Sequence, residues 1–272
     1  AAAFAALPWR HLGRGPTRPW SFRPLTGVMT FVLALLAGAC VTGILAHLMD
    51  VDLQAAGIID YLPLMIGAWG SQLGVVAFLP LIRRVCEPQA SPQDRQMPRR
   101  GVVCPDRRRS RLYAIGVGVV GLLLFWPMTQ CVGYLGGMAQ EWLTGDAPSE
   151  VAHGTLQLLI DAAPGLASWI AVICIAIIPG IVEEVLYRGL LQTSLHRLQP
   201  FGHATQWHAV ILTSLIFTAM HVGAVDVHAL AALLVLSLGF GWAYARTGRL
   251  TASITMHIGF NTGNLLLAVP WI

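Results

Sequence analysis

The chain contains no lysine, so all 17 of its basic residues are arginine. Charged residues of either sign make up only 11% of the 272 residues, whereas hydrophobic residues make up 56%. This scarcity of charge excludes an ordinary soluble globular domain. We therefore expect an integral membrane protein.

Cysteine is also scarce, and the five cysteines form no C-x-x-C pair. Because most of them lie in apolar segments, the sequence predicts neither a cysteine zinc cluster nor a disulfide framework. Residues 116–121 have the form G-x-G-x-x-G. No strand precedes this motif and no acidic ribose ligand follows it, so it predicts close helix packing rather than nucleotide binding.

Long apolar runs predict an all-α, polytopic transmembrane bundle with seven or eight spans of about 20 residues each. The spans are expected at residues 25–49, 58–82, 112–140, 156–196, 207–222, 228–245 and 250–269. The fourth run is too long for one straight span, and Pro164-Gly165 and Pro179-Gly180 mark the points where it should break or kink. A break there would raise the count to eight. We expect one transmembrane domain over residues 25–272, after a cytoplasmic tail of residues 1–24.

The arginines are distributed very unevenly among the predicted connections. Sixteen of the 17 fall on one side, in the tail, in the loop of residues 83–111, or at Arg197, Arg246 and Arg249. The connections on the other side contain acidic residues and no arginine. Because cytoplasmic loops are enriched in arginine, this predicts a cytoplasmic N-terminus. The all-arginine composition and the compact size look more like those of a bacterial protein, so we expect a bacterial inner membrane. The same rule, together with anionic lipid headgroups, explains the loop of residues 83–111 without a nucleic-acid partner.

Polar residues nevertheless occur inside the later apolar runs, where ionisable groups usually mark a functional site. The candidates are Glu183, Glu184, Arg188, His221, His257 and Asn261. Adjacent helical residues point in different directions, while Arg188 lies one turn beyond Glu184. We expect Arg188 to compensate Glu184 and Glu183 to be freer to act as a base.

Helix geometry predicts that these groups share one layer of the bundle. At about 1.5 Å per residue, Glu183 lies roughly 21 Å from Arg197, and His257 roughly 12 Å from Arg249. His221 lies about 21 Å from Trp207, and Asn261 about 18 Å from Arg249. We therefore expect these polar groups to converge in space.

Three short motifs carry a family resemblance. Residues 183–188 have the form E-E-x-x-x-R, residues 217–221 the form F-x-x-x-H, and residues 257–261 the form H-x-x-x-N. In this order they resemble the CAAX protease and bacteriocin-processing family (CPBP, or Abi) of intramembrane proteases. Residues 239–248 also look like the segment that precedes the last motif in this family. The resemblance implies a catalytic core over residues 150–270 that encloses a polar intramembrane cavity. We expect this cavity to open toward the cytoplasmic half.

The resemblance further implies an intramembrane endopeptidase, a hydrolase acting on a membrane-associated protein or peptide within the bilayer. By this analogy, Glu183 and His221 activate water, and His257 and Asn261 hold the tetrahedral oxyanion. Glu184 with Arg188 would position the first pair. Because the cluster contains no matched serine or cysteine nucleophile, we expect no acyl-enzyme, and we expect no cofactor.

Three alternatives stay open. Two histidines and a glutamate could hold Zn²⁺, although Asn261 is a poor zinc ligand and Arg188 disfavours a second cation. The chain could instead be a membrane scaffold or bacteriocin-immunity protein without activity. It could also be a transporter that uses Glu183, Glu184 and Arg188 as a relay, although no internal repeat supports this. The sequence predicts neither the substrate nor the oligomeric state.

Overall fold

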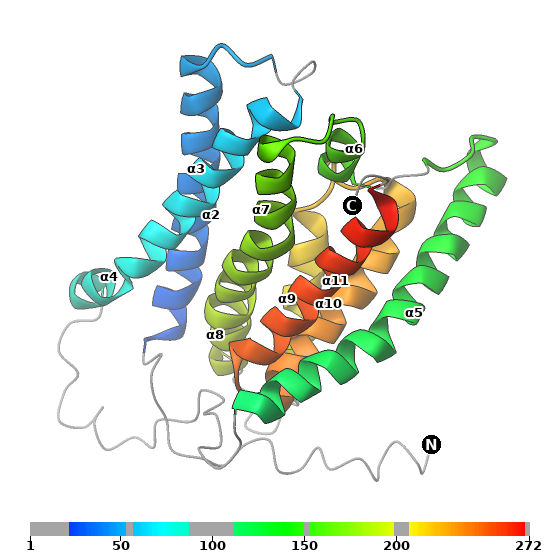
Figure 1. Cartoon of the computed structure of the whole chain (residues 1–272). Helices are drawn as coiled ribbons and strands as arrows, with labels where there is room; N and C mark the ends of the chain where they lie inside the picture. The colour runs from blue at the N-terminus through cyan, green and yellow to red at the C-terminus, as the bar shows by residue number, and fades with distance from the viewer. Residues whose placement is uncertain (1–21, 53–56, 87–110, 150–152, 199–206, 270–272) are drawn as a thin grey trace, which may run out of the picture.

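The computed structural model describes residues 22–52, 57–86, 111–149, 153–198 and 207–269 (Figure 1). In these residues the regular elements are helices, apart from two isolated β-bridges. The helices are α2 (Pro24–Leu48), α3 (Ile58–Ala77), α4 (Leu79–Cys86), α5 (Arg111–Thr144), α6 (Gly154–Ile160), α7 (Leu166–Glu183), η2 (Glu184–Gln192), α8 (Thr193–Leu198), α9 (Trp207–Ala219), α10 (Val227–Thr247) and α11 (Leu250–Ala268). Among the described residues, four stretches are long and apolar enough to cross a membrane: α2, α5, the continuous run Leu166–Leu198, and α10. The all-helical membrane fold is confirmed, and the count of seven or eight spans stays a prediction.

The helices begin and end close to the predicted span boundaries. The second apolar run is divided, because α3 ends at Ala77 and α4 begins at Leu79. The fourth run breaks at Pro164-Gly165, which separates α6 from α7. With seven residues, α6 is about 10 Å long and too short to span a bilayer. Most of the tail of residues 1–24 and of the loop of residues 83–111 lies outside the described residues.

The two ends of the bundle differ in charge. The end at which α2, α5 and α11 begin, here called the arginine end, holds Arg23, Arg111, Arg197, Arg246 and Arg249. The opposite end, here called the acidic end, holds Asp50, Asp52, Asp60, Glu141, Asp146, Asp161 and Asp226. The helix directions therefore bear out the charge separation expected from the sequence for the described residues.

One continuous helical run, α7–η2–α8, passes through the centre of the bundle. Pro179 lies inside α7 and has no N–H with which to bond the preceding turn. Directly after Glu183 the run widens into the nine-residue π-helix η2. Such segments are rare and often lie at functional sites. Most of η2 is buried, including Leu186 and Leu190, so it forms the middle of the protein core.

Glycines allow α5 and α11 to approach closely, as the small residues in the sequence predict. A Cβ at Gly118 would lie 2.5 Å from the carbonyl oxygen of Ala252 on α11. In return, a Cβ at Gly259 would lie 2.6 Å from Leu122 on α5. The G-x-G-x-x-G segment is thus part of a helix interface.

Candidate active site

A cavity of about 1040 Å³ lies between α3, α5, α7, α10 and α11. Four predicted site residues line it: Glu183, His221, His257 and Asn261. The other two, Glu184 and Arg188, are fully buried behind it, each with a side chain 0% exposed. The predicted convergence of the three motifs is therefore observed, with two of the six residues behind the cavity wall.

Glu184 and Arg188 form a buried pair that joins two adjacent turns of the central run. Arg188 Nε lies 3.4 Å from Glu184 Oε2, as the spacing predicts. The guanidinium also donates through Nη2 to the carbonyl and the hydroxyl of Ser237 on α10, each at 2.8 Å. The rings of Phe217 and Phe240 lie 5.1 and 5.4 Å from its central carbon. These contacts compensate a charge that would otherwise be costly to bury.

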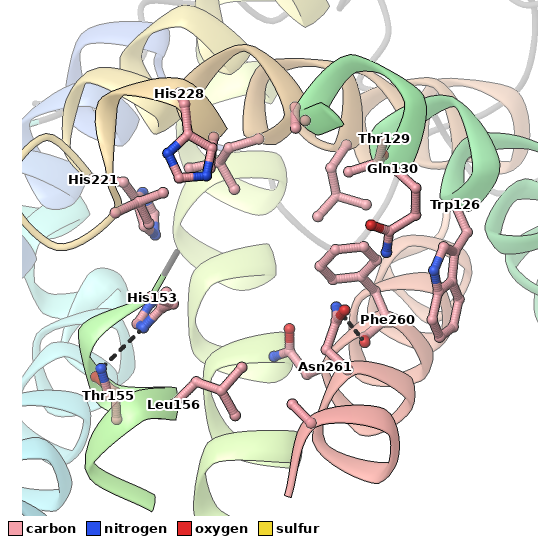
Figure 2. A pocket seen from close by; sticks show the side chains of 18 of the residues that line it. Trp126, Thr129, Gln130, His153, Thr155, Leu156, His221, His228, Phe260 and Asn261 are labelled. Atoms are coloured by element: carbon pink, nitrogen blue, oxygen red, sulfur yellow. Dashed lines mark hydrogen bonds between the residues drawn. The ribbon is translucent and has the colours of Figure 1, made fainter. Parts of the chain in front are cut away.

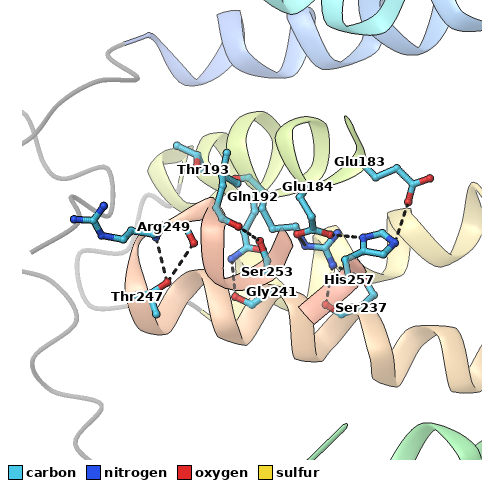
Figure 3. Close-up of polar contacts among 12 residues, drawn as sticks. Glu183, Glu184, Gln192, Thr193, Ser237, Gly241, Thr247, Arg249, Ser253 and His257 are labelled. Atoms are coloured by element: carbon cyan, nitrogen blue, oxygen red, sulfur yellow. Dashed lines mark hydrogen bonds and ion pairs between the residues drawn. The ribbon is translucent and has the colours of Figure 1, made fainter. Parts of the chain in front are cut away.

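His257 lies between the two glutamates (Figure 3). Its Nδ1 donates to Glu184 Oε1 at 3.0 Å, because a carboxylate beside an arginine is an acceptor. Its Nε2 lies 3.9 Å from Glu183 Oε2. The ring stacks on Phe240, with centroids 4.4 Å apart and planes 18° apart. Glu184 therefore contacts His257 directly. The expectation that Glu184 and Arg188 position Glu183 and His221 stays a prediction.

The different directions of the adjacent glutamates are also observed. The Glu183 side chain is 22% exposed and faces the cavity, whereas the Glu184 side chain is fully buried. The Glu183 carboxylate lines the cavity and is therefore the one available to a ligand there. Thus Glu183 faces the cavity, whereas Glu184 belongs to the buried layer behind it.

His221 lies in the turn after α9, and the backbone sets its tautomer. Its Nδ1 is 2.7 Å from the carbonyl oxygen of Phe217, one turn earlier. A carbonyl can only accept, so Nδ1 carries the hydrogen and Nε2 of the neutral ring is left as a proton acceptor. The Phe217 ring supports the imidazole at a centroid distance of 4.4 Å. The F-x-x-x-H spacing thus has a direct structural reason.

Asn261 connects α11 to the proline in α7. Its Nδ2 donates to the carbonyl oxygen of Ile175 at 3.4 Å. This carbonyl lacks its usual helical partner, because the residue four positions later is Pro179. One N–H of the amide therefore satisfies the kinked helix, and the second is left for a ligand in the cavity.

The cavity also contains histidines that the sequence does not single out. Figure 2 shows His153, His221 and His228 along one side, with Asn261 and Phe260 along the other. His153 precedes α6, and its Nδ1 accepts a hydrogen bond from the Thr155 backbone N–H. Burial, and secondly the nearby His221, lower the pKa of His153 below its ordinary value.

The direction of the cavity differs from the expectation. On α7 it is lined by Ile175, Pro179 and Glu183, and on α11 by residues from His257 onward. Within the described chain, these lining residues run from the Glu183 layer toward the acidic end. The expectation that the cavity opens toward the arginine-bearing half is therefore wrong. Counting residues gives the depth of a side chain but not the side on which packing leaves space.

No group of three histidine, cysteine, aspartate or glutamate side chains in the described ranges is arranged to hold a metal ion. His257 Nδ1 bonds Glu184, and its Nε2 lies 3.9 Å from Glu183 Oε2.

Two supporting residues, Ser237 and Phe240, could not be assigned from the sequence. They contact Arg188 and His257 from α10. Of the two, only Phe240 lies in a segment with a family resemblance, residues 239–248.

Residues 165–263 match the family described as type II CAAX prenyl endopeptidase Rce1-like. This segment is therefore similar to the Rce1-like family. It contains all six predicted site residues and begins where α7 begins. No curated protein and no solved structure matches the chain. The family is a CAAX protease family, as its description states.

Proposed function

We propose that the chain is an intramembrane endopeptidase that hydrolyses a peptide bond of a membrane-associated protein or peptide. The observation that carries this proposal is the placement of Glu183, His221, His257 and Asn261 on the wall of one cavity. The Rce1-like match over the same residues supports it independently. The catalytic core is residues 150–270 of a single membrane domain, with the N-terminus in the cytoplasm of a bacterial cell.

The proposed reaction begins with water in the cavity beside Glu183 and His221. Glu183 removes a proton while the water oxygen attacks the peptide carbonyl, with the unprotonated Nε2 of His221 as a second acceptor. The carbonyl oxygen becomes an oxyanion that accepts hydrogen bonds from Asn261 and from protonated His257. The intermediate collapses when a proton passes to the leaving amine. One water is consumed, and a new carboxylate and a new amine are released.

The buried pair acts on this chemistry through His257. Glu184 keeps the imidazole in one orientation, and Arg188 keeps the carboxylate in place. Glu184 and Arg188 are thus positioning residues, whereas the other four contact the substrate or water.

The test compares the termini of membrane proteins in cells that contain the wild-type chain or Glu183→Gln, by terminal-peptide mass spectrometry. The substitution is nearly isosteric and removes the proposed base. We expect some new termini only with the wild-type chain, and these would identify substrates. Identical termini, with equal amounts of both proteins in the membrane, would refute proteolysis and favour a scaffold or immunity role.

A further inference from the structure

The cavity borders α5 and α10 only along their parts nearer the acidic end. On α5 the lining residues run from Trp126 to Glu141, and on α10 from His228 to Phe240. None of the described residues 111–125 or 241–247, at the arginine ends of these helices, lines it. The cavity therefore extends in one direction from the Glu183 layer.

The opposite direction is filled by protein. Between Glu183 and the arginine end, the next layer of the central run contains side chains that are completely buried. These include Glu184, Leu186, Arg188 and Leu190. The Phe217 and Phe240 rings pack against Arg188 in this layer. The path from the Glu183 carboxylate to the arginine end is thus occupied by a packed core built around an ion pair.

At the acidic end, the connections between helices form the rim of the cavity. The α5–α6 connection contributes Pro148, Ser149 and His153, and the α9–α10 connection contributes Val225. The two connections touch, since Gly154 N–H donates to Ala224 at 3.3 Å and Ser149 bonds Asp226. Glu141 also lines the cavity near this end. The rim therefore carries acidic and polar groups that water can reach.

The charge distribution determines which side of the membrane this end faces. Residues 49–60, 141–165 and 220–228, which make the acidic-end connections, contain no arginine. Sixteen arginines lie at the other end or in the connections that join it. Cytoplasmic segments retain arginine and translocated segments lack it. The acidic end is therefore the non-cytoplasmic end.

We infer that the cavity takes its peptide from the non-cytoplasmic face, so that the substrates are membrane-anchored polypeptides cut on that side of the bilayer. The volume of about 1040 Å³ lies at the upper limit for small-molecule pockets, which span about 300–1,000 Å³, and suits an extended peptide segment. That the peptide is a substrate rests on the proposed function, whereas the access route rests on the cavity and the charges.

Single-cysteine labelling tests the access route without requiring catalysis. The five native cysteines are replaced by serine, and one cysteine is then introduced per variant. Ala229→Cys reports on the cavity wall, Asp146→Cys on the acidic-end surface, and Arg111→Cys on the arginine-end surface. Each variant is treated with a membrane-impermeant maleimide, in intact bacterial cells and in inside-out vesicles.

We expect Ala229→Cys and Asp146→Cys to be labelled in intact cells, and Arg111→Cys only in inside-out vesicles. If Ala229→Cys, like Arg111→Cys, is labelled only in inside-out vesicles, the inference is overturned, because the cavity would then open at the arginine end. If Asp146→Cys is labelled only in vesicles, the acidic end faces the cytoplasm, and the inference is overturned as well. Absence of label at Ala229→Cys, with Asp146→Cys labelled, would also overturn it, since a cavity that admits a peptide admits the reagent.

Two further variants keep the test decisive. Thr155→Cys is a second cavity position, to be used if Ala229→Cys does not elute as a folded protein. Adding Glu183→Gln to Ala229→Cys should leave labelling unchanged, because access does not depend on the base. Labelling as expected without any wild-type-specific termini would refute the proposed protease and leave the access route intact.

Discussion

The buried ion pair between Glu184 and Arg188 allows a quantitative prediction. Replacing Glu184 by glutamine leaves the Arg188 guanidinium without its counter-charge in a fully buried layer. Breaking a buried pair in this way costs about 3–5 kcal/mol. For a chain of this size each kcal/mol lowers the melting temperature by about 2–4 °C. We therefore expect Glu184→Gln to lower it by about 6–20 °C.

The double variant Glu184→Gln/Arg188→Met separates a charge effect from a packing effect. It removes both charges, and the glutamine oxygen still accepts from His257 Nδ1. Replacing a whole buried pair by groups of similar volume is close to neutral. We expect the double variant to regain most of the stability lost in Glu184→Gln, which is a strong positive coupling in the mutant cycle.

The assay is thermal unfolding in detergent, followed by tryptophan fluorescence and by the fraction that still elutes as a single species. Glu183→Gln is the matched control, because it is the same substitution at the adjacent residue, whose side chain is 22% exposed and faces the cavity. We expect a much smaller shift for this control. Equal shifts for the two single variants, or additive losses in the double variant, would refute the reasoning that Glu184 and Arg188 form one compensated unit.

Three other predictions concern the cavity histidines. His257→Gln should reduce cleavage of a substrate found by terminal mass spectrometry by about 10²-fold or more, which is the usual cost of removing one oxyanion donor. Its melting temperature should stay near that of the wild type. Full activity of the variant would exclude this role. Because the pKa of His153 is lowered in the folded state, its contribution to stability should be present above about pH 6.5 and lost as the pH falls below that value. His153→Asn, which keeps an acceptor for Thr155 N–H, should therefore flatten the fall in melting temperature on acidification, and an unchanged slope would contradict this. Metal analysis of purified protein should find no stoichiometric zinc in the wild type or in His221→Ala, whereas zinc that is lost in His221→Ala would establish the metal-dependent alternative.

Much of the fold could be predicted because membrane helices are determined by local composition. The first apolar run was expected at residues 25–49, and α2 is Pro24–Leu48. The last was expected at residues 250–269, and α11 is Leu250–Ala268. The bilayer requires every backbone group to bond within its own helix, so a long apolar run has few alternatives. The π-helix η2 gave no such signal, since it depends on how the central run packs.

The candidate site was predictable in its members and less so in its contacts. The i, i+4 spacing of Glu184 and Arg188 predicted their ion pair, and the same spacing joins Phe217 to His221. The bond between Glu184 and His257 links residues 73 positions apart. No periodicity within one helix can report such a contact, because it depends on the relative rotation of η2 and α11.

The sequence by itself determined the helical membrane class, the charge difference between the two ends, and the layer at which the polar residues lie. Each of these follows from composition or from the fixed rise of a helix. The tertiary structure decided that His257 lies between Glu183 and Glu184, that Asn261 bonds the carbonyl freed by Pro179, and that the cavity extends toward the acidic end. These features depend on where packed helices leave space and on which faces they turn toward each other. A single run of residues does not contain that information.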